Sequence, residues 1–170
     1  RVGPFTAARL AIKTESVSDF LFQHGIDAPI EGQPYSQLRM AQVDAAKSHQ
    51  LWVIERHGCA DFHVSEITSS QIIAALHHGE AFLRRKRDFA DDRDGFEHAS
   101  NLVRAAANEL GVDWTCDLFF AAERQYWQSR NQAARVQKAR QDGLGLGWAN
   151  HDHHTYRSSR ENFARLVALL

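Results

Sequence analysis

Apolar residues recur over most of the chain at the three- and four-residue spacing of an amphipathic helix. Glycine directly follows several of these runs, as expected just past the end of a helix, and a capping box formed by Thr68 and Gln71 precedes another. Between the second and third runs, residues 59–65 alternate in the manner of a short strand. The pattern predicts five helices, in residues 5–24, 35–57, 72–89, 95–110 and 117–142.

The pattern changes after the fifth predicted helix. Gly143, Gly145 and Gly147 stand at alternate positions and predict a flexible joint; the strand before and helix after that a dinucleotide-binding loop needs are missing. Residues 150–157 are typical of a short strand, and a capping box in residues 158–161 predicts an amphipathic helix after it.

Together these elements predict a mainly α fold. A helical domain over residues 1–142 precedes a glycine-rich joint and a strand–helix unit over residues 143–170, which we interpret as the beginning of an α/β, metal-binding domain. The chain starts without Met and stops at Leu170 inside an apolar helical pattern, so we expect it to be part of a longer protein.

Composition narrows the function classes. The formal net charge of -1, from 20 basic and 21 acidic side chains, gives no bulk electrostatic argument for binding nucleic acid or an anionic membrane. No apolar run reaches the length of a membrane helix, so we expect no membrane association. The two cysteines, Cys59 and Cys116, form neither a disulfide framework nor a CxxC pair, which favours a reducing, cytoplasmic location.

The chemically richest segment is Asn150–Arg160. On a strand, His151, His153 and Arg157 share one face, because successive side chains alternate. Neutral imidazole is the commonest protein ligand of iron, zinc and copper, and an arginine further along the same face of the strand suits a substrate carboxylate. The pattern predicts a metal-plus-anion site, against the alternative of a polar surface strand that happens to contain histidines. Nothing local fixes a third ligand.

A resemblance adds to this interpretation. The run Asp152-His153-His154-Thr155-Tyr156-Arg157, followed by a capped helix, resembles the first strand and helix of vicinal-oxygen-chelate domains. It is most similar to the Asp-His-x-x-Phe-Arg pattern of the 2-oxoadipate dioxygenase/decarboxylase family, with Tyr156 in place of Phe, and the similarity covers about the last twenty residues.

The resemblance implies a specific enzyme class. In that family the histidine binds iron and the arginine four positions later holds the substrate carboxylate. It therefore implies His153 as a metal ligand and Arg157 as the carboxylate clamp. We expect His151, on the same face of the predicted strand, to be a further ligand or a neighbour that orients one. The implied cofactor is Fe(II), with another divalent metal as the alternative, and the implied activity is oxygenation of a 2-oxo acid.

Two further histidine clusters are weaker candidates. Glu55 and His57, with Asp61 and His63 shortly after, could contribute metal ligands, although a histidine at the end of a helix is also favoured by the helix dipole alone. The adjacent pair His77–His78 points in directions about 100° apart on a helix, which is poor geometry for one metal, and we expect it at the surface.

Basic residues suggest a competing, non-catalytic function. The fifth predicted helix carries a basic stretch that could bind a protein partner or phosphate, which would make the chain a helical interaction module. The alternative is a solvated helix whose aromatic turns face the core. Residues 84–94 mix five basic and four acidic side chains and predict a solvated turn. The basic stretch consists of Arg124, Arg130, Arg135, Lys138 and Arg140.

Overall fold

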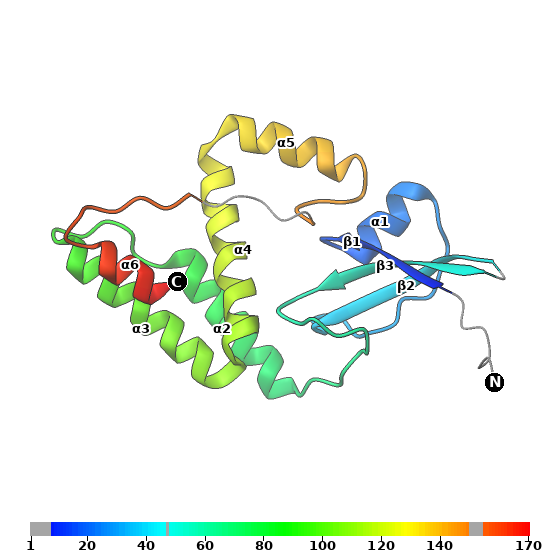
Figure 1. Cartoon of the computed structure of the whole chain (residues 1–170), viewed down its shortest axis with the longest axis horizontal. Helices are drawn as coiled ribbons and strands as arrows, with labels where there is room; N and C mark the ends of the chain where they lie inside the picture. The colour runs from blue at the N-terminus through cyan, green and yellow to red at the C-terminus, as the bar shows by residue number, and fades with distance from the viewer. Residues whose placement is uncertain (1–7, 47, 150–154) are drawn as a thin grey trace. The chain divides into compact units, whose positions relative to one another are not determined.

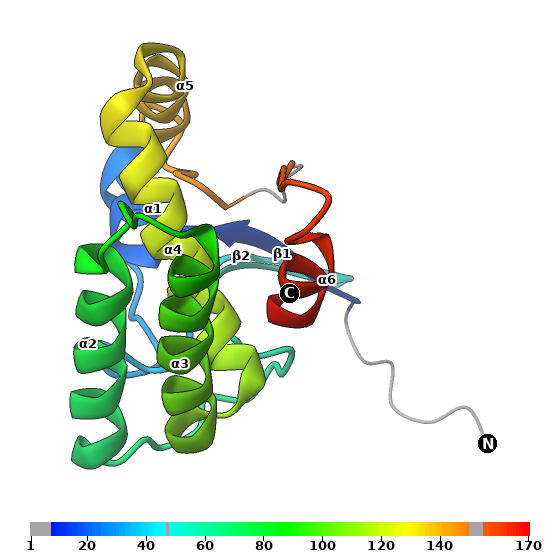
Figure 2. The same cartoon turned by 90° about the vertical axis from the view of Figure 1, so that its left-hand side faces the viewer.

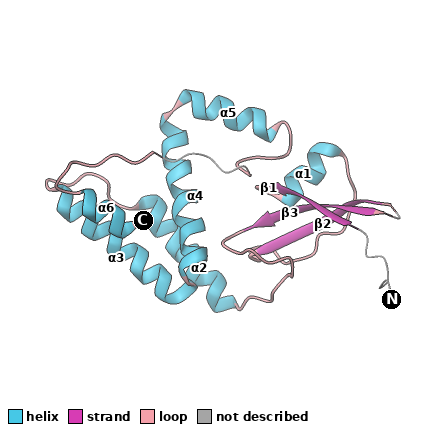
Figure 3. Ribbon diagram, in the orientation of Figure 1, coloured by secondary structure: helices cyan, strands magenta, loops and turns pink. Residues whose placement is uncertain are grey.

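The fold is α+β, so the predicted mainly α class is wrong. The computed structural model describes residues 8–46, 48–149 and 155–170, which contain six helices and one three-stranded mixed sheet (Figures 1 and 3). The chain divides into two compact units. The sheet unit contains described residues up to 66 together with 131–149, and the helical unit contains residues 67–130 and 155–170.

The sheet is formed by β1 (Ala8–Thr14), β2 (Leu38–Ala45) and β3 (His49–Arg56) in the order β1-β3-β2. β3 runs parallel to β1 and antiparallel to β2, with which it forms a hairpin (Figure 1). The Ala46 amide donates a 2.8 Å hydrogen bond to the carbonyl of His49 and closes that hairpin. The helix predicted over residues 35–57 is therefore wrong: this stretch is two strands.

Burial explains why this segment is extended. Trp52 to Glu55 are four consecutive buried residues, which a central strand covered on both faces accommodates. Ala41 and Val53 lie opposite each other and face one apolar cluster, whereas Met40 and Ile54 form the next pair and face another. Contacts on both faces of the sheet thus outweigh the helix propensity of the Ala, Gln and Leu residues here.

Helix α1 (Val17–His24) covers the first of these faces. Ser16 caps it by accepting a 3.2 Å hydrogen bond from the Asp19 amide, and Gly25 ends it with φ 62°, a left-handed conformation that suits glycine. The predicted end at this glycine is confirmed, but the helix predicted over residues 5–24 is shorter, because β1 occupies the first part.

The glycine-rich segment packs against α1 and the loop before it. The Glu15 amide donates a 2.9 Å hydrogen bond to the Leu146 carbonyl, and Leu146 joins the apolar cluster under α1. A Cβ on Gly145 (φ +68°) would lie 2.9 Å from Phe20 Cα, so only glycine permits this approach. The segment predicted as a flexible joint is a packed part of the sheet unit.

The helical unit is built on α2 (Ser69–Arg84), α3 (Asp92–Leu110) and α4 (Val112–Arg130). They run successively antiparallel (Figure 2), each packed against the other two. The predicted capping box is confirmed, since Thr68 accepts from the Gln71 amide and the Gln71 side chain accepts from the Thr68 amide. The core between the helices consists of Phe82, Ala106, Phe119 and Ala122, with partly buried apolar residues around them.

The fifth predicted helix is interrupted at Asn131. This residue has extended backbone angles, φ -123° and ψ 117°, and its side chain accepts a 3.2 Å hydrogen bond from the Ala134 amide. Asparagine is a strong N-cap because it satisfies a free amide of the first turn. The stretch is therefore two helices, α4 and α5 (Gln132–Asp142), and they belong to different compact units.

The last element is α6 (Phe163–Leu169), which packs on α3. The predicted capping box at residues 158–161 does not start it: its N-cap is Asn162, without a side-chain cap hydrogen bond. Residues 155–159 are irregular, so the described part of the predicted strand over residues 150–157 is not a strand. Among the helices described, none combines the length and apolar character needed to cross a bilayer.

Candidate functional site

The structure locates one of the three residues assigned to the predicted metal-plus-anion site. His151 and His153 lie outside the described residues. Arg157 is exposed on the irregular segment before α6, and it makes neither an ion pair nor a hydrogen bond with the residues that the structure describes. Its guanidinium is therefore accessible to a ligand.

Tyr156, the neighbour of Arg157, is half-buried in the helical unit. Burial raises the pKa of its hydroxyl, the negative charge of Glu123 raises it further, and the positive charge of Arg85 opposes both. These effects place the tyrosine within the electrostatic field of two residues of the helical core.

Glu123 is the centre of a buried ion-pair cluster. It lies on α4 with 8% of its side chain exposed and receives Arg85 and Arg87 from the segment that follows α2. Arg87 Nη2 lies 2.7 Å from Glu123 Oε1 and Nη1 lies 3.2 Å from Oε2, a two-pronged contact, while Arg85 Nη1 also donates to Oε1. Burial raises the pKa of Glu123, but the two arginines outweigh it, so the pKa lies below its ordinary value.

The ring of Tyr126 lies next to this cluster and contacts two arginines. The guanidinium carbon of Arg87 lies 3.7 Å from the centre of the Tyr126 ring, and that of Arg130 lies 3.8 Å from it. Two guanidinium groups cannot both stack this closely on one face, so the ring lies between them. Trp127 meets Tyr126 edge-on, with centroids 5.1 Å apart, and is 59% exposed.

The structure shows why the sequence prediction missed this cluster. Residues 84–94 were interpreted as a solvated turn because their charges nearly cancel. After Arg85, which has extended backbone angles, exposure alternates: Lys86 and Asp88 are exposed, whereas Arg85, Arg87 and Phe89 are half-buried. A period of two in an extended segment puts the two arginines on its inner side.

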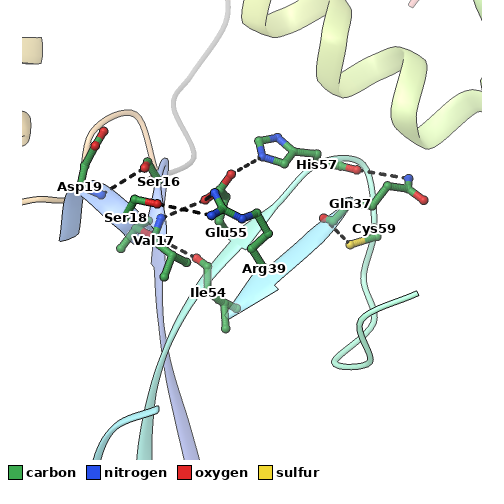
Figure 4. Close-up of polar contacts among 11 residues, drawn as sticks. Ser16, Val17, Ser18, Asp19, Gln37, Arg39, Ile54, Glu55, His57 and Cys59 are labelled. Atoms are coloured by element: carbon green, nitrogen blue, oxygen red, sulfur yellow. Dashed lines mark hydrogen bonds and ion pairs between the residues drawn. The ribbon is translucent and has the colours of Figure 1, made fainter. Parts of the chain in front are cut away.

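A second polar cluster lies in the sheet unit, at the end of β3 (Figure 4). Glu55, with 10% of its side chain exposed, accepts a 2.9 Å hydrogen bond from the Val17 amide at the start of α1 and pairs with Arg39 at 3.2 Å. His57 Nε2 lies 2.9 Å from its other oxygen. Arg39 also donates to the Ser18 hydroxyl at 3.4 Å. One carboxylate thus links β2, β3 and α1.

These partners control the protonation of Glu55. Burial raises its pKa, but the hydrogen bonds from His57 and Val17 and the charges of His57 and Arg39 lower it more, so the pKa lies below its ordinary value. The glutamate therefore remains ionised and orients a half-exposed imidazole, an arrangement that serves metal-binding and general-base histidines.

The remaining members predicted for this cluster do not complete a site. His57 follows a strand rather than closing a helix, and Asp61 and His63 are exposed in an irregular loop, where the predicted short strand is absent. The Cys59 thiol donates to the Gln37 carbonyl at 3.1 Å, and burial raises its pKa, which lowers its reactivity. Across residues 8–46, 48–149 and 155–170, no three His, Cys, Asp or Glu side chains form a group able to hold a metal ion.

The other predicted candidates take different positions. His77 is exposed as expected, but His78 is 5% exposed and lies 3.0 Å from Glu109 of α3, so its predicted surface position is wrong. The basic stretch is divided between the two units at Asn131. Lys138 of α5 pairs with Glu15 at 2.9 Å and with Asp142. These ion pairs neutralise one positive charge of the basic stretch.

Comparison of the chain with protein-family models, with curated proteins and with solved structures finds no match.

Proposed function

We propose that this chain carries the ligand-binding segment of a metal-dependent oxygenase that acts on a 2-oxo acid. His153 binds the metal, His151 is a further ligand or orients one, and Arg157 binds the carboxylate of the substrate remote from the metal. The metal is Fe(II) or another divalent ion. When bound, it supplies a centre that chelates both oxygens of the oxo acid and activates dioxygen.

One observation of the described chain supports this assignment. Arg157 is exposed, while Tyr156 beside it is half-buried near Glu123 and Arg85. A half-buried residue has less freedom than an exposed one, so Arg157 is presented to solvent next to a partly restrained position. Such pre-organisation reduces the entropy lost when a guanidinium binds a carboxylate.

The donor chemistry of the segment fits the metal. His151, Asp152, His153 and His154 supply three imidazoles and one carboxylate, the donor types of a non-haem iron centre. The proposal assigns the metal to His153 and His151 because this segment resembles an iron-binding pattern, whereas Glu55 and His57 belong to no group of three metal-binding side chains among the residues described.

Metal content tests the metal assignment. The full chain, prepared anaerobically with Fe(II), is measured by inductively coupled plasma mass spectrometry beside His153→Ala and, as a matched control, His77→Ala on the exposed side of α2. We expect near-stoichiometric iron in the parent and the control and loss of iron in His153→Ala. Equal iron in all three, or none in the parent, contradicts the proposal.

Substrate binding tests the carboxylate assignment separately. Titration of the metal-loaded chain with a dicarboxylic 2-oxo acid is compared for Arg157→Met and for Arg160→Met, an exposed arginine three residues later. Loss of a charged hydrogen bond should weaken binding about tenfold or more in the first variant only. Equal affinity of the two variants removes Arg157 from the site.

A further inference from the structure

The ion-pair cluster around Glu123 has an unbalanced charge. The side chains of Arg85 and Arg87 are 13% and 16% exposed, and both bind this one carboxylate, which is 8% exposed. In the part of the chain that the structure describes, neither arginine pairs with a second carboxylate. Two positive charges and one negative charge thus remain in a largely dehydrated setting. Burying a second positive charge that only shares a carboxylate is costly, so the arrangement favours the binding of a further anion.

Arg87 adds a second, independent sign. Its Nε is shielded from solvent and has no hydrogen-bond partner among the residues that the structure describes. Nearly all buried donors in native structures are satisfied, and an exception calls for an explanation such as an ion or ligand. The contacts within the described chain therefore leave one hydrogen-bond donor of Arg87 unsatisfied.

Arg130 brings another positive charge to the same place. It stacks on the face of Tyr126 opposite Arg87 and is exposed, and within the described part of the chain it donates to the Tyr126 carbonyl and the Ser129 hydroxyl. The tyrosine hydroxyl lies at the edge of the ring that separates the two guanidinium groups. Three arginines and one glutamate give this cluster a net charge of about +2.

We propose that Arg87 and Arg130 bind a phosphate monoester at the hydroxyl edge of Tyr126. A phosphate monoester carries about -1.5 to -2 charges at pH 7, which balances the cluster, whereas a single carboxylate leaves one positive charge over. The planar fork of Arg130 matches two phosphate oxygens, while Arg87, whose two terminal nitrogens bind Glu123, adds its positive charge beside them. Trp127, exposed beside Tyr126, offers an aromatic face to the organic part of the ligand. This site is independent of the proposed metal chemistry.

Calorimetric titration of the metal-free full chain tests the site, with inorganic phosphate, phenyl phosphate and succinate as probes. The variants are Arg87→Gln, which leaves Glu123 paired with Arg85, and the exposed Arg130→Gln. The matched control is Arg104→Gln, an exposed arginine of α3 with the same change in charge. Circular dichroism verifies that each variant is folded.

We expect saturable binding of both phosphates, about tenfold to a hundredfold weaker in each site variant and unchanged in the control. Trp127→Ala should weaken phenyl phosphate more than inorganic phosphate. No saturable binding of phosphate up to about 10 mM overturns the proposal. So do equal losses in the control variant or a preference for succinate over both phosphates. None of these results depends on whether His153 binds iron.

Discussion

Replacing Glu123 with leucine removes the carboxylate that both Arg85 and Arg87 contact. Loss of one partner from a buried ion pair usually costs about 3–5 kcal/mol, because the other charge stays buried without compensation. The arginines keep 13% and 16% exposure and can partly turn toward water, so the lower end of this range applies. We expect Glu123→Leu to lower the free energy of unfolding by about 3 kcal/mol.

A triple variant separates buried charge from lost packing. Glu123→Leu combined with Arg85→Met and Arg87→Met replaces all the charges with apolar groups of similar length, and such replacements of complete ion-pair networks are often neutral. We expect the triple variant to be more stable than the single variant by at least about 1 kcal/mol. Urea denaturation measures both, and hydrogen exchange of peptides from α2 to α4 assigns the change to the helical unit.

Acidity provides a further check on the same carboxylate. Because the pKa of Glu123 is lowered in the fold, its contribution is complete above the unfolded value of about 4.3 and is lost as the pH falls through the folded value. The stability difference between the parent and Glu123→Leu should therefore shrink below about pH 4. A difference that is independent of pH, or a triple variant less stable than the single one, refutes the reasoning.

Three other substitutions test the local structure. Glu55→Gln keeps the size of the side chain but loses its charge, so urea denaturation should show a loss of about 2 kcal/mol; an unchanged midpoint would mean that its ion pairs are not stabilising. Gly147→Ala should destabilise by more than about 1 kcal/mol, because its Cβ would lie 2.7 Å from Glu15 Cβ, whereas Gly25→Ala, at φ +62° and with no described atom within 4 Å, measures the cost of positive φ alone; equal losses would exclude the clash. Thr68→Ala removes the α2 cap and should cost about 1 kcal/mol; normal exchange protection in the first turn would contradict its role.

Elements with their own boundary signals were predictable from the sequence. The Thr68 capping box and the glycine at position 111 mark the start of α2 and the end of α3, and both signals act within a few residues. The hairpin of β2 and β3 has no such boundary signal in its sequence. Ala45, Ala46 and Ser48 precede or occupy its turn, without the Gly, Asn or Pro of common hairpin loops. The extended conformation of this region is set by the pairing of its strands, which a single sequence does not reveal.

The two polar clusters were harder to predict for the same reason. Glu55 meets Val17 across 38 positions of the chain, and Glu123 meets Arg85 across the same separation. Residue type identified Glu55 and His57 as candidates, but not that the carboxylate would hold the start of a helix. Arg85 and Arg87 were dismissed because charge counting ignores which side of an extended segment each residue occupies.

The hydrogen bond from the Trp148 amide to Glu15 spans 133 positions of the chain. On a ribosome that adds roughly 5–20 residues per second, Trp148 is synthesised about 7–27 seconds after Glu15. Meanwhile β1, α1 and the hairpin emerge without the segment that supplies Leu146 to their apolar cluster. During synthesis part of the apolar core of the sheet unit therefore stays exposed until residue 146 is made, in a form that a chaperone could recognise.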